Sequence, residues 1–391
     1  MRIFSAVRHS IDPRYFYGGL WSGMFHPALG RLGHEVIVSN VDLRPAWKLP
    51  EESPLHVQSR AAITEHIVEE VRQAHAQQPI DLFLSYFYNA HFDPAGFDEI
   101  HRLGIPTVNF YCNSICQFDL VAKIAPNVTF AWHAEKHAEP HYRQCGAKPV
   151  WVQMAADPEI YRPLTNVTRQ PRACFIGQRY ADRDRLAAAL IKSGVPLDLY
   201  GSGWGNGDSE TTSDASPANS GTTSSYLAAV RWNLRTLGPL AGTARTFRQW
   251  SYRRQTRKLT PLLAKAARGR APDLASAFAA YDVALNFSNV WADGRSGSAL
   301  IPHVRLRDFE GPMCRTCYLT AHNDEIEEFY EVGKEIDTYR TADELVDKTR
   351  FYLSHPAEAE KLRNAGYARA RVEHTWERRF EELFRKTGVG N

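Results

Sequence analysis

Several features are scarce in this chain, and each absence excludes a class of protein. Six cysteines in 391 residues are too few for a disulfide framework, so we expect reduced thiols. No apolar run approaches the roughly 20 residues that cross a bilayer. The N-terminal apolar segment turns polar at Arg8 and His9, before it reaches the length of a secretory signal. We therefore expect a cytoplasmic protein without a membrane-spanning helix.

Acidic residues are absent from one long stretch. Asp214 and Asp273 enclose eleven Arg or Lys residues and no acid, although the net charge of the chain is only +3. Aromatic and aliphatic residues are interleaved with these cations over residues 226–263, a mixture typical of helices at the lipid headgroup boundary. Gly238-Pro239 and Gly242 interrupt this segment, which predicts two short helices. The residues predicted to form its binding surface are Arg231, Trp232, Arg248, Trp250, Arg253 and Arg254.

The partner expected for this basic segment is an anionic membrane surface or a lipid-linked acceptor. Such a contact would hold the protein at the inner face of the membrane. A solvated helical insertion or a surface for a partner protein is the alternative. Nucleic acid is not expected, because no recognised RNA-binding or DNA-binding module accompanies the segment.

The length and the pattern of the chain predict an α/β protein with two domains. Chains longer than about 300 residues seldom fold around one core. Strand-like and helix-like segments alternate over residues 2–110 and again over 173–204, which is typical of doubly wound parallel sheets. We therefore expect two Rossmann-like domains that face a cleft. The predicted parts are residues 1–160, residues 161–375 with a basic, partly flexible insertion at about 205–272, and a C-terminal helix at 376–391 that packs back toward the first domain.

Two glycine-containing loops stand between a predicted strand and a predicted helix. Gly18 and Gly19 lie in the first domain, and Gly177 lies in the second. A backbone without Cβ atoms can approach an anion, and the helix N-terminus adds partial positive charge. Arg179 and Arg183 follow Gly177, and guanidinium groups can clamp a diphosphate. A tight turn without a ligand is the alternative for each loop.

Short fragments toward the C-terminus carry their information in their order and spacing. They are Val304-Arg305-Leu306-Arg307-Asp308-Phe309-Glu310, Tyr318-Leu319-Thr320, Glu328-Phe329, Thr341-Ala342-Asp343-Glu344-Leu345 and His374-Thr375-Trp376. Further fragments of the same pattern are Leu32-Gly33-His34-Glu35-Val36, residues 156–163 and Tyr200-Gly201-Ser202-Gly203-Trp204. With these fragments the chain resembles the CgeB-like branch of glycosyltransferases, which is related to the group 1 (family 4) enzymes of the GT-B fold. The resemblance covers most of residues 1–204 and 280–391.

The resemblance implies a glycosyltransferase that moves a sugar from a UDP-, GDP-, ADP- or dTDP-linked donor to a saccharide, lipid-linked or other acceptor. The pathway implied is the synthesis of cell-surface polysaccharide or glycoconjugate. The resemblance also implies that Glu310 binds the ribose hydroxyls, which suits a carboxylate facing a vicinal diol. An acid that merely complements a helix dipole is the alternative for Glu310. The donor-site residues implied are Gly177, Arg179, Arg183, Tyr200, Gly201, Trp204, Arg307, Phe309 and Glu310.

Two departures from the related family affect the prediction of catalytic residues. Pro302 stands eight positions before Glu310, where family 4 enzymes usually carry a second acid. The segment 111–114 also lacks the carboxylate that relatives have after the corresponding strand. His9 and Asp12 are therefore our candidates for the catalytic base. A sugar-nucleotide epimerase and a non-catalytic scaffold in surface or coat assembly are the alternatives.

No metal or other cofactor is expected, because arginines can neutralise the departing diphosphate. His133, His137 and His141 recur at intervals of four residues, which is a pattern that zinc sites use. Pro140 interrupts the helix that this pattern would need. Cys314 and Cys317 have the spacing of a redox motif, but we expect them to pack in the core.

Overall fold

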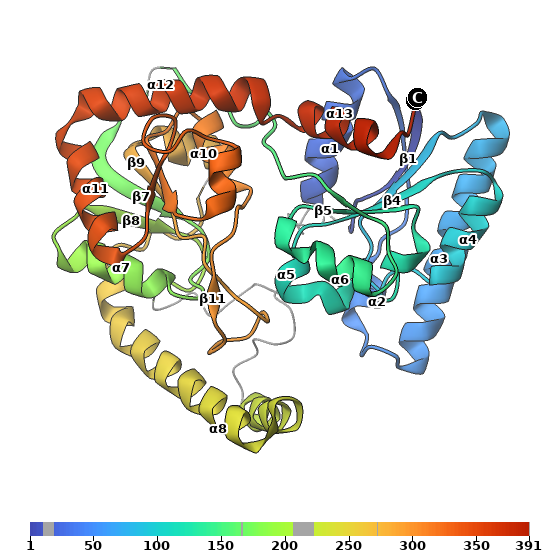
Figure 1. Ribbon diagram of the computed structural model, residues 1–391, viewed down its shortest axis with the longest axis horizontal. Coiled ribbons are helices and arrows are strands. Elements are labelled where there is room, and N and C mark those ends of the chain that lie inside the picture. The colour runs from blue at the N-terminus through green and yellow to red at the C-terminus, as the bar shows by residue number, and fades with distance from the viewer. Residues whose placement is uncertain (11–18, 166, 206–222, 272, 391) are drawn as a thin grey trace. The chain divides into compact units, whose positions relative to one another are not determined.

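The computed structural model describes residues 1–10, 19–165, 167–205, 223–271 and 273–390. The chain divides into two compact units, Met1–Asp157 with Thr375–Asn391 and Pro158–His374 (Figure 1). The sequence predicts boundaries at 160 and 375, close to the positions where the structure divides. Each unit is built on one parallel sheet, which confirms the α/β class with two Rossmann-like domains.

The first unit contains a six-stranded sheet in the order β2-β1-β3-β4-β5-β6, and every neighbouring pair is parallel. The strands are β1 (Arg2–Ala6), β2 (Glu35–Val38), β3 (Leu82–Ser85), β4 (Thr107–Tyr111), β5 (Phe130–His133) and β6 (Pro149–Trp151). The inner strands β3, β4 and β5 are buried along their whole length, as expected for a sheet with helices on both faces.

The helices of this unit include one that returns from the far end of the chain. They are α1 (Leu20–Arg31), α2 (Arg44–Lys48), α3 (Pro54–Gln77), α4 (Pro94–Arg102), α5 (Ser114–Gln117), α6 (Glu139–Gln144) and α13 (Trp376–Thr387), with 3-10 turns η2 (Phe118–Leu120), η3 (Ala125–Asn127) and η4 (Lys136–Ala138). Helix α13 buries Trp376 and Phe380 against Phe25 of α1, with ring centroids 4.8 and 5.2 Å apart. Thr375 caps α13 and pairs with Ala156 in a parallel bridge, which ties the C-terminus to this unit.

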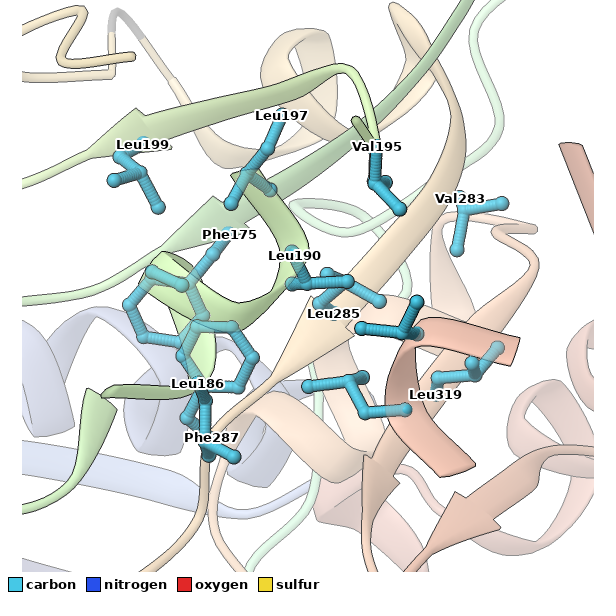
Figure 2. Close-up of a cluster of buried hydrophobic side chains, with 14 of the residues drawn as sticks. Phe175, Leu186, Leu190, Val195, Leu197, Leu199, Val283, Leu285, Phe287 and Leu319 are labelled. Atoms are coloured by element: carbon cyan, nitrogen blue, oxygen red, sulfur yellow. The ribbon is translucent and has the colours of Figure 1, made fainter. Parts of the chain in front are cut away.

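The second unit contains a five-stranded parallel sheet in the order β13-β12-β9-β7-β8. Its strands are β7 (Gln170–Ile176), β8 (Leu197–Tyr200), β9 (Tyr281–Asn286), β12 (Tyr318–Ala321) and β13 (Asp337–Tyr339), and a short antiparallel pair joins β10 (Val290–Trp291) to β11 (Leu300–Ile301). Figure 2 shows apolar side chains from the strands β7, β8, β9 and β12 and from α7 meeting in one core cluster. Within it the rings of Phe175 and Phe287 stack 4.3 Å apart.

The helices of the second unit are α7 (Arg183–Lys192), α8 (Thr223–Leu263), α9 (Leu274–Ala279), α10 (Arg307–Met313), α11 (Ala342–Ser354) and α12 (Pro356–Glu373), with a 3-10 turn η6 (Asp324–Glu328). Helix α8 is two helical arms joined at Gly238, whose φ of 77° and ψ of 171° are not helical. This break confirms the two helices predicted for the basic segment. Among the described residues, no helix combines the length and the apolar character that a membrane span requires.

Candidate functional site

The loops that follow β7 and β8 pack directly against each other at the C-terminal edge of the second sheet. Gly201 has a φ of 119°, and a Cβ atom on it would collide with the carbonyl oxygen of Gly177. The amide of Gly177 donates to the Tyr200 carbonyl oxygen at 2.9 Å, and the Trp204 indole N–H donates to the Gly177 carbonyl oxygen at 2.8 Å. These contacts fix the turn at Gly177, at the sheet edge where doubly wound folds bind ligands.

Arg183 begins α7 directly beyond this turn. Its Nε donates to the carbonyl oxygen of Phe287 at 2.9 Å, and its Nη1 donates to that of Gln178 at 2.8 Å. Burial, together with the positive charges of Arg305 and Arg307, lowers the pKa of Arg183 to about 10, although the negative charge of Asp182 acts in the opposite direction. In the described part of the chain, no carboxylate lies within ion-pair distance of this guanidinium. The surroundings of Arg183 therefore favour an anion.

Arg307 and Glu310 are neighbours on α10. Glu310 is only 1% exposed, and one of its oxygens accepts a hydrogen bond from Nη1 of Arg307. Nε of Arg307 lies 3.4 Å from the carbonyl oxygen of Ile176, at the end of β7. Burial acts to lower the pKa of Arg307, but the charge and hydrogen bond of Glu310, together with Tyr161 and Tyr318, outweigh burial and raise the pKa. The structure thus places the Arg307–Glu310 pair beside the Gly177 turn, although 130 residues separate them in sequence.

The hydroxyl of Tyr161 also contacts Glu310. Burial raises the pKa of Tyr161, and the charge and hydrogen bond of the Glu310 carboxylate raise it further. This tyrosine follows the boundary between the two units and was not predicted as a site residue. The only sequence signal for it is its place in the fragment 156–163.

Asp308 connects α10 to the strands β9 and β12. Its carboxylate accepts hydrogen bonds from Asn286 at 3.0 Å, from Thr320 at 2.8 Å and from Tyr318 at 3.1 Å, and from the amide of Arg305 at 2.7 Å. Burial raises the pKa of Asp308, and these hydrogen bonds act against that rise. Asp308 therefore positions Arg307 and Glu310 relative to strands β9 and β12.

Arg179 does not face an open site as predicted. Its guanidinium donates to Thr260 Oγ1 at 3.0 Å and to the Thr256 carbonyl oxygen at 2.5 Å, and it pairs with Asp184 at 3.4 Å. All of these partners lie on α8 or α7. The structure gives Arg179 the role of tying the Gly177 loop to α8 in place of the predicted diphosphate contact.

Two further predicted donor-site residues are packing residues in the structure. Phe309 is fully buried and packs edge-on against Phe329, with centroids 5.4 Å apart. Trp204 is fully buried in the core cluster and reaches the site only through its hydrogen bond to Gly177. The hydroxyl of Tyr200 bonds that of Tyr281 at 2.8 Å, and this tyrosine is only half-buried, so its place in a base pocket stays a prediction. The rings of Phe309 and Trp204 are buried, and the sequence alone does not distinguish a ring that stacks on a ligand from a buried one.

A cavity of about 260 Å³ opens at the C-terminal ends of β7, β9, β12 and β13, within the second unit. It is lined by Asp182, Leu186, Asn289, Pro302, Ala321, His322, Tyr339, Arg340, Thr341 and Ala342. Asp182 Oδ2 accepts from Asn289 Nδ2 at 2.7 Å, whereas Asp182 Oδ1 is buried with no hydrogen-bond partner among the described residues. Burial raises the pKa of Asp182. A carboxylate that lines a polar cavity can accept a hydrogen bond from a donor such as a hydroxyl group.

Sequence reasoning missed this cavity. Pro302 and Asp182 both line it, and the sequence resemblance implies an acid at position 302 in family 4 enzymes. His322 and Arg340 line it as well, and their side chains contact each other at 2.6 Å. The signal that could have found them is positional, because His322 and Arg340 each directly follow a strand.

In the first unit, His9 lies in an aromatic cluster at the C-terminal ends of β1 and β3. Its Nε2 contacts the carbonyl oxygen of Tyr86 at 2.5 Å, and its ring stacks on that of Tyr86 with centroids 4.5 Å apart. Tyr88 and His91 pack edge-on against the same ring. Burial lowers the pKa of His9 to about 4, so the imidazole is neutral at neutral pH. Sequence reasoning missed Tyr86, Tyr88 and His91, although they follow β3 directly.

Of the remaining predicted residues of this unit, only Gly19 is among the described residues. Asp12 and Gly18 lie outside the described residues. Gly19 is the residue before α1, and no side chain caps that helix. The predicted phosphate or acceptor loop at Gly18 and Gly19 therefore stays a prediction.

The histidines and cysteines have structural partners. His133 ends β5, His137 lies in η4 and His141 lies in α6, so the three do not share one helical face. Across the described residues, no group of three or more His, Cys, Asp or Glu side chains could hold a metal. None of the six cysteines forms a disulfide, and burial raises the pKa of the Cys314 and Cys317 thiols. These two thiols pack in the core.

The basic surface predicted on α8 is partly occupied by contacts within the unit. Nε of Arg248 donates to the carbonyl oxygen of Gly297 at 2.9 Å, and the guanidinium of Arg295 lies 3.7 Å from the ring centroid of Trp232. Trp232 is therefore half-buried against the 293–297 loop and does not belong to an open surface. The exposed members of the predicted set are Arg231, Arg248, Trp250, Arg253 and Arg254.

Comparisons with known proteins agree with this architecture. Residues 225–385 match a family model described as glycosyl transferase-like. No curated protein sequence matches the chain. A glycosyltransferase structure from Rickettsia africae has a TM-score of 0.60 at 11% identity, with 100% of this chain and 99% of that chain covered. The family match is thus confined to residues 225–385, and the whole chain has the fold of the GT-B glycosyltransferases.

Two other solved structures align along their whole length. A sucrose-phosphate synthase from Thermosynechococcus elongatus has a TM-score of 0.54 at 13% identity, with 100% of both chains covered. The Anabaena protein HepE, in complex with UDP and glucose, has a TM-score of 0.55 at 12% identity, with 99% of both chains covered. At these identities the likeness establishes the fold, as the sequence resemblance predicts.

Proposed function

We propose that the protein is a glycosyltransferase that transfers a hexosyl group from a nucleotide-sugar donor bound by the second unit. The observation that carries the proposal is the group formed by Arg183, Arg307 and Glu310 at the Gly177 turn. It combines a buried carboxylate with two guanidinium groups at the ligand-binding edge of the sheet. The family match over residues 225–385 includes two of these three residues and supports the same reading.

In this proposal Glu310 accepts hydrogen bonds from the two ribose hydroxyls. Arg183 and Arg307 neutralise the diphosphate and stabilise it as it departs, so that no metal ion is required. The HepE structure contains UDP and glucose, which makes a uridine donor the first one to test.

The donor sugar in this proposal occupies the cavity beside Asp182. The carboxylate of Asp182 accepts a hydrogen bond from a sugar hydroxyl, and it takes over the contact that a carboxylate at position 302 makes in family 4 enzymes. The acceptor, a saccharide or a lipid-linked saccharide, binds the first unit. There His9 and Asp12 remain the candidates for the base.

A thermal-shift screen with UDP, GDP, ADP, CMP and dTDP, with and without a divalent metal, tests the donor site. A nucleotide at about 100 times its Kd stabilises the folded state by about 2.7 kcal/mol, which raises Tm by roughly 5–10 °C in a domain of this size. Glu310→Ala should abolish the shift. Glu327→Ala, which removes an exposed acid from the same unit, should keep it.

Silence across the whole panel would favour the non-catalytic scaffold, for which Pro302 is the specific observation. An epimerase would instead convert the donor sugar nucleotide when no acceptor is present. Product analysis of the donor alone distinguishes that activity from transfer.

A further inference from the structure

Exposed apolar side chains are concentrated on α8. Six of the thirteen exposed large apolar residues in the described part of the chain lie on this helix. They are Leu227, Leu234, Leu237, Leu240, Phe247 and Trp250. Leu240 is 89% exposed and Phe247 is 64% exposed. Single exposed apolar residues are common on any protein, but such a cluster on one element marks an interaction surface.

The apolar residues of each arm lie on one face. In the first arm they stand at 227, 230, 234 and 237, and in the second arm leucine, phenylalanine and tryptophan stand at 240, 247 and 250. These spacings of three, four and seven residues place side chains on one stripe of a helix. A groove of about 290 Å³ joins the two stripes, and it is lined by Val230, Leu234, Thr243, Thr246, Phe247 and Trp250. The two arms thus present one continuous apolar surface, which we call the α8 apolar face.

The opposite side of the second arm is the one that packs. Arg245 is buried and pairs with Asp293 at 2.8 Å, and Gln249 donates to the carbonyl oxygen of Ser296 at 3.0 Å. A helix that serves only its own domain turns its apolar stripe toward the core. The end of the second arm follows this rule, because Leu259, Leu262 and Leu263 pack into the core cluster. Around residues 245–249, however, polar side chains face the domain, while Leu240, Phe247 and Trp250 are exposed, so this part of the sequence is suited to an apolar environment outside the unit.

The two arms are held firmly together. A Cβ atom on Gly242 would lie 2.6 Å from the carbonyl oxygen of Asn233, so only glycine permits this approach. The buried side chain of Asn233 donates to Thr246 Oγ1 and to Gln249 Oε1, both at 3.1 Å. The α8 apolar face is therefore a built surface. In Figure 1 the arm drawn in yellow extends away from α7 and the sheet of its own unit.

Cations follow the apolar face along the second arm. Arg254, Arg257 and Lys258 are exposed, and the guanidinium of Arg254 lies 5.4 Å from the ring centroid of Trp250. No Asp or Glu occurs anywhere in α8. An apolar zone bordered by a purely cationic zone complements the acyl chains and the anionic headgroups of a membrane surface.

We propose that α8 docks this protein on a membrane surface that contains anionic lipid. Leu240, Phe247 and Trp250 enter the boundary between headgroups and acyl chains, while Arg254 and Lys258 contact lipid phosphates. The docking does not depend on glycosyl transfer, and a protein that fails to bind a nucleotide would still show it. It would bring the second unit close to any acceptor held by lipid.

Flotation of the purified full-length protein with vesicles tests the proposal. The wild type should float with vesicles of phosphatidylcholine and phosphatidylglycerol, and much less with phosphatidylcholine alone. Combined Leu240→Ser and Phe247→Ser should lower the partition coefficient by at least about tenfold. The matched control combines Leu55→Ser and Phe351→Ser, which are 65% and 44% exposed outside α8, and it should float like the wild type.

A charge variant tests the second element of the proposal. Arg254→Gln with Lys258→Gln should lower binding to the anionic vesicles roughly thirtyfold and weaken its salt dependence. Arg371→Gln with Arg385→Gln removes two exposed charges elsewhere and should have little effect. Unchanged thermal unfolding of each variant shows that the fold is intact.

Two outcomes would overturn the proposal. One is equal flotation of the wild type and both α8 variants. The other is a wild type that ignores vesicles but forms dimers in solution that Leu240→Ser with Phe247→Ser dissociates, because the α8 apolar face would then bind a second copy of the chain.

Discussion

Replacing Gly201 by alanine tests whether the Gly177 turn is held by backbone packing. At a φ of 119° any L-residue is strained, which costs roughly 1–2 kcal/mol. The new Cβ atom would also meet the carbonyl group of Gly177, which is backbone and cannot swing aside. Overpacking of this kind adds roughly 1–3 kcal/mol. We therefore expect Gly201→Ala to destabilise the second unit by roughly 2–5 kcal/mol.

The matched control is Gly194→Ala. Gly194 has a φ of 78°, and a Cβ atom on it would meet nothing within 4 Å. This variant has the backbone strain without the collision, so it should lower the free energy of unfolding by only roughly 1 kcal/mol. The difference between the two variants isolates the contact between the loops after β7 and β8.

Urea unfolding of both variants, followed by nucleotide-induced thermal shift, measures the effect. Gly201→Ala should lose most of the shift because the Gly177 turn must move, whereas Gly194→Ala should retain it. Equal destabilisation of the two variants would refute the reasoning, since the collision would then contribute nothing. A destabilised Gly201→Ala that still gives the full shift would show that the turn does not shape the donor site.

Two further predictions concern Asp182 and His9. Asp182→Asn should lower kcat/KM for the donor roughly 10- to 100-fold, but it should keep the thermal shift with the nucleoside diphosphate alone. Asp347→Asn, which changes an exposed acid, is the control. An unchanged kcat/KM would exclude Asp182 from sugar binding. The pKa of His9 is about 4 in the folded state against 6.5 when unfolded, so below pH 6.5 the unfolded chain binds the extra proton and stability falls. Urea unfolding of the wild type should lose about 2 kcal/mol from this group between pH 7.5 and 5, and His9→Gln should remove that part of the loss; an identical pH dependence in the variant would contradict the burial of His9.

The parts of the fold that could be predicted from the sequence are those with local signals. Gly177 and the helix that starts at Arg183 are recognisable because a β-run, a glycine and a helical pattern follow one another within a few residues. The break in α8 is recognisable because Gly238-Pro239 has no helical alternative. The role of Glu310 is implied by the resemblance that rests on the order and spacing of the fragments. In the structure, Glu310 accepts a hydrogen bond from Arg307, which lies one helical turn earlier.

The parts that the sequence does not indicate depend on contacts between distant segments. Arg179 looks like a phosphate ligand in the sequence, but its partners Thr256 and Thr260 stand about 80 positions later. Trp204 follows a glycine-rich turn, and only the packed sheet shows that its ring is in the core. The cavity beside Asp182 collects residues from four strand ends, so no single window of sequence contains it. Side-chain direction and long-range partners are tertiary properties that local patterns do not encode.

The charge around Arg183 bears on the choice between an enzyme and a scaffold. The guanidinium of Arg183 lies near the positive charges of Arg305 and Arg307, and burial and these charges lower its pKa although the charge of Asp182 opposes them. A protein with a purely structural role gains nothing from this repulsion between cations. A salt bridge or an apolar residue at position 183 would remove the repulsion. A diphosphate would supply the missing negative charge and turn the repulsion into binding energy. Repulsion between cations beside the Gly177 turn is expected at a site that binds an anionic donor. This repulsion favours a donor site over a purely structural role.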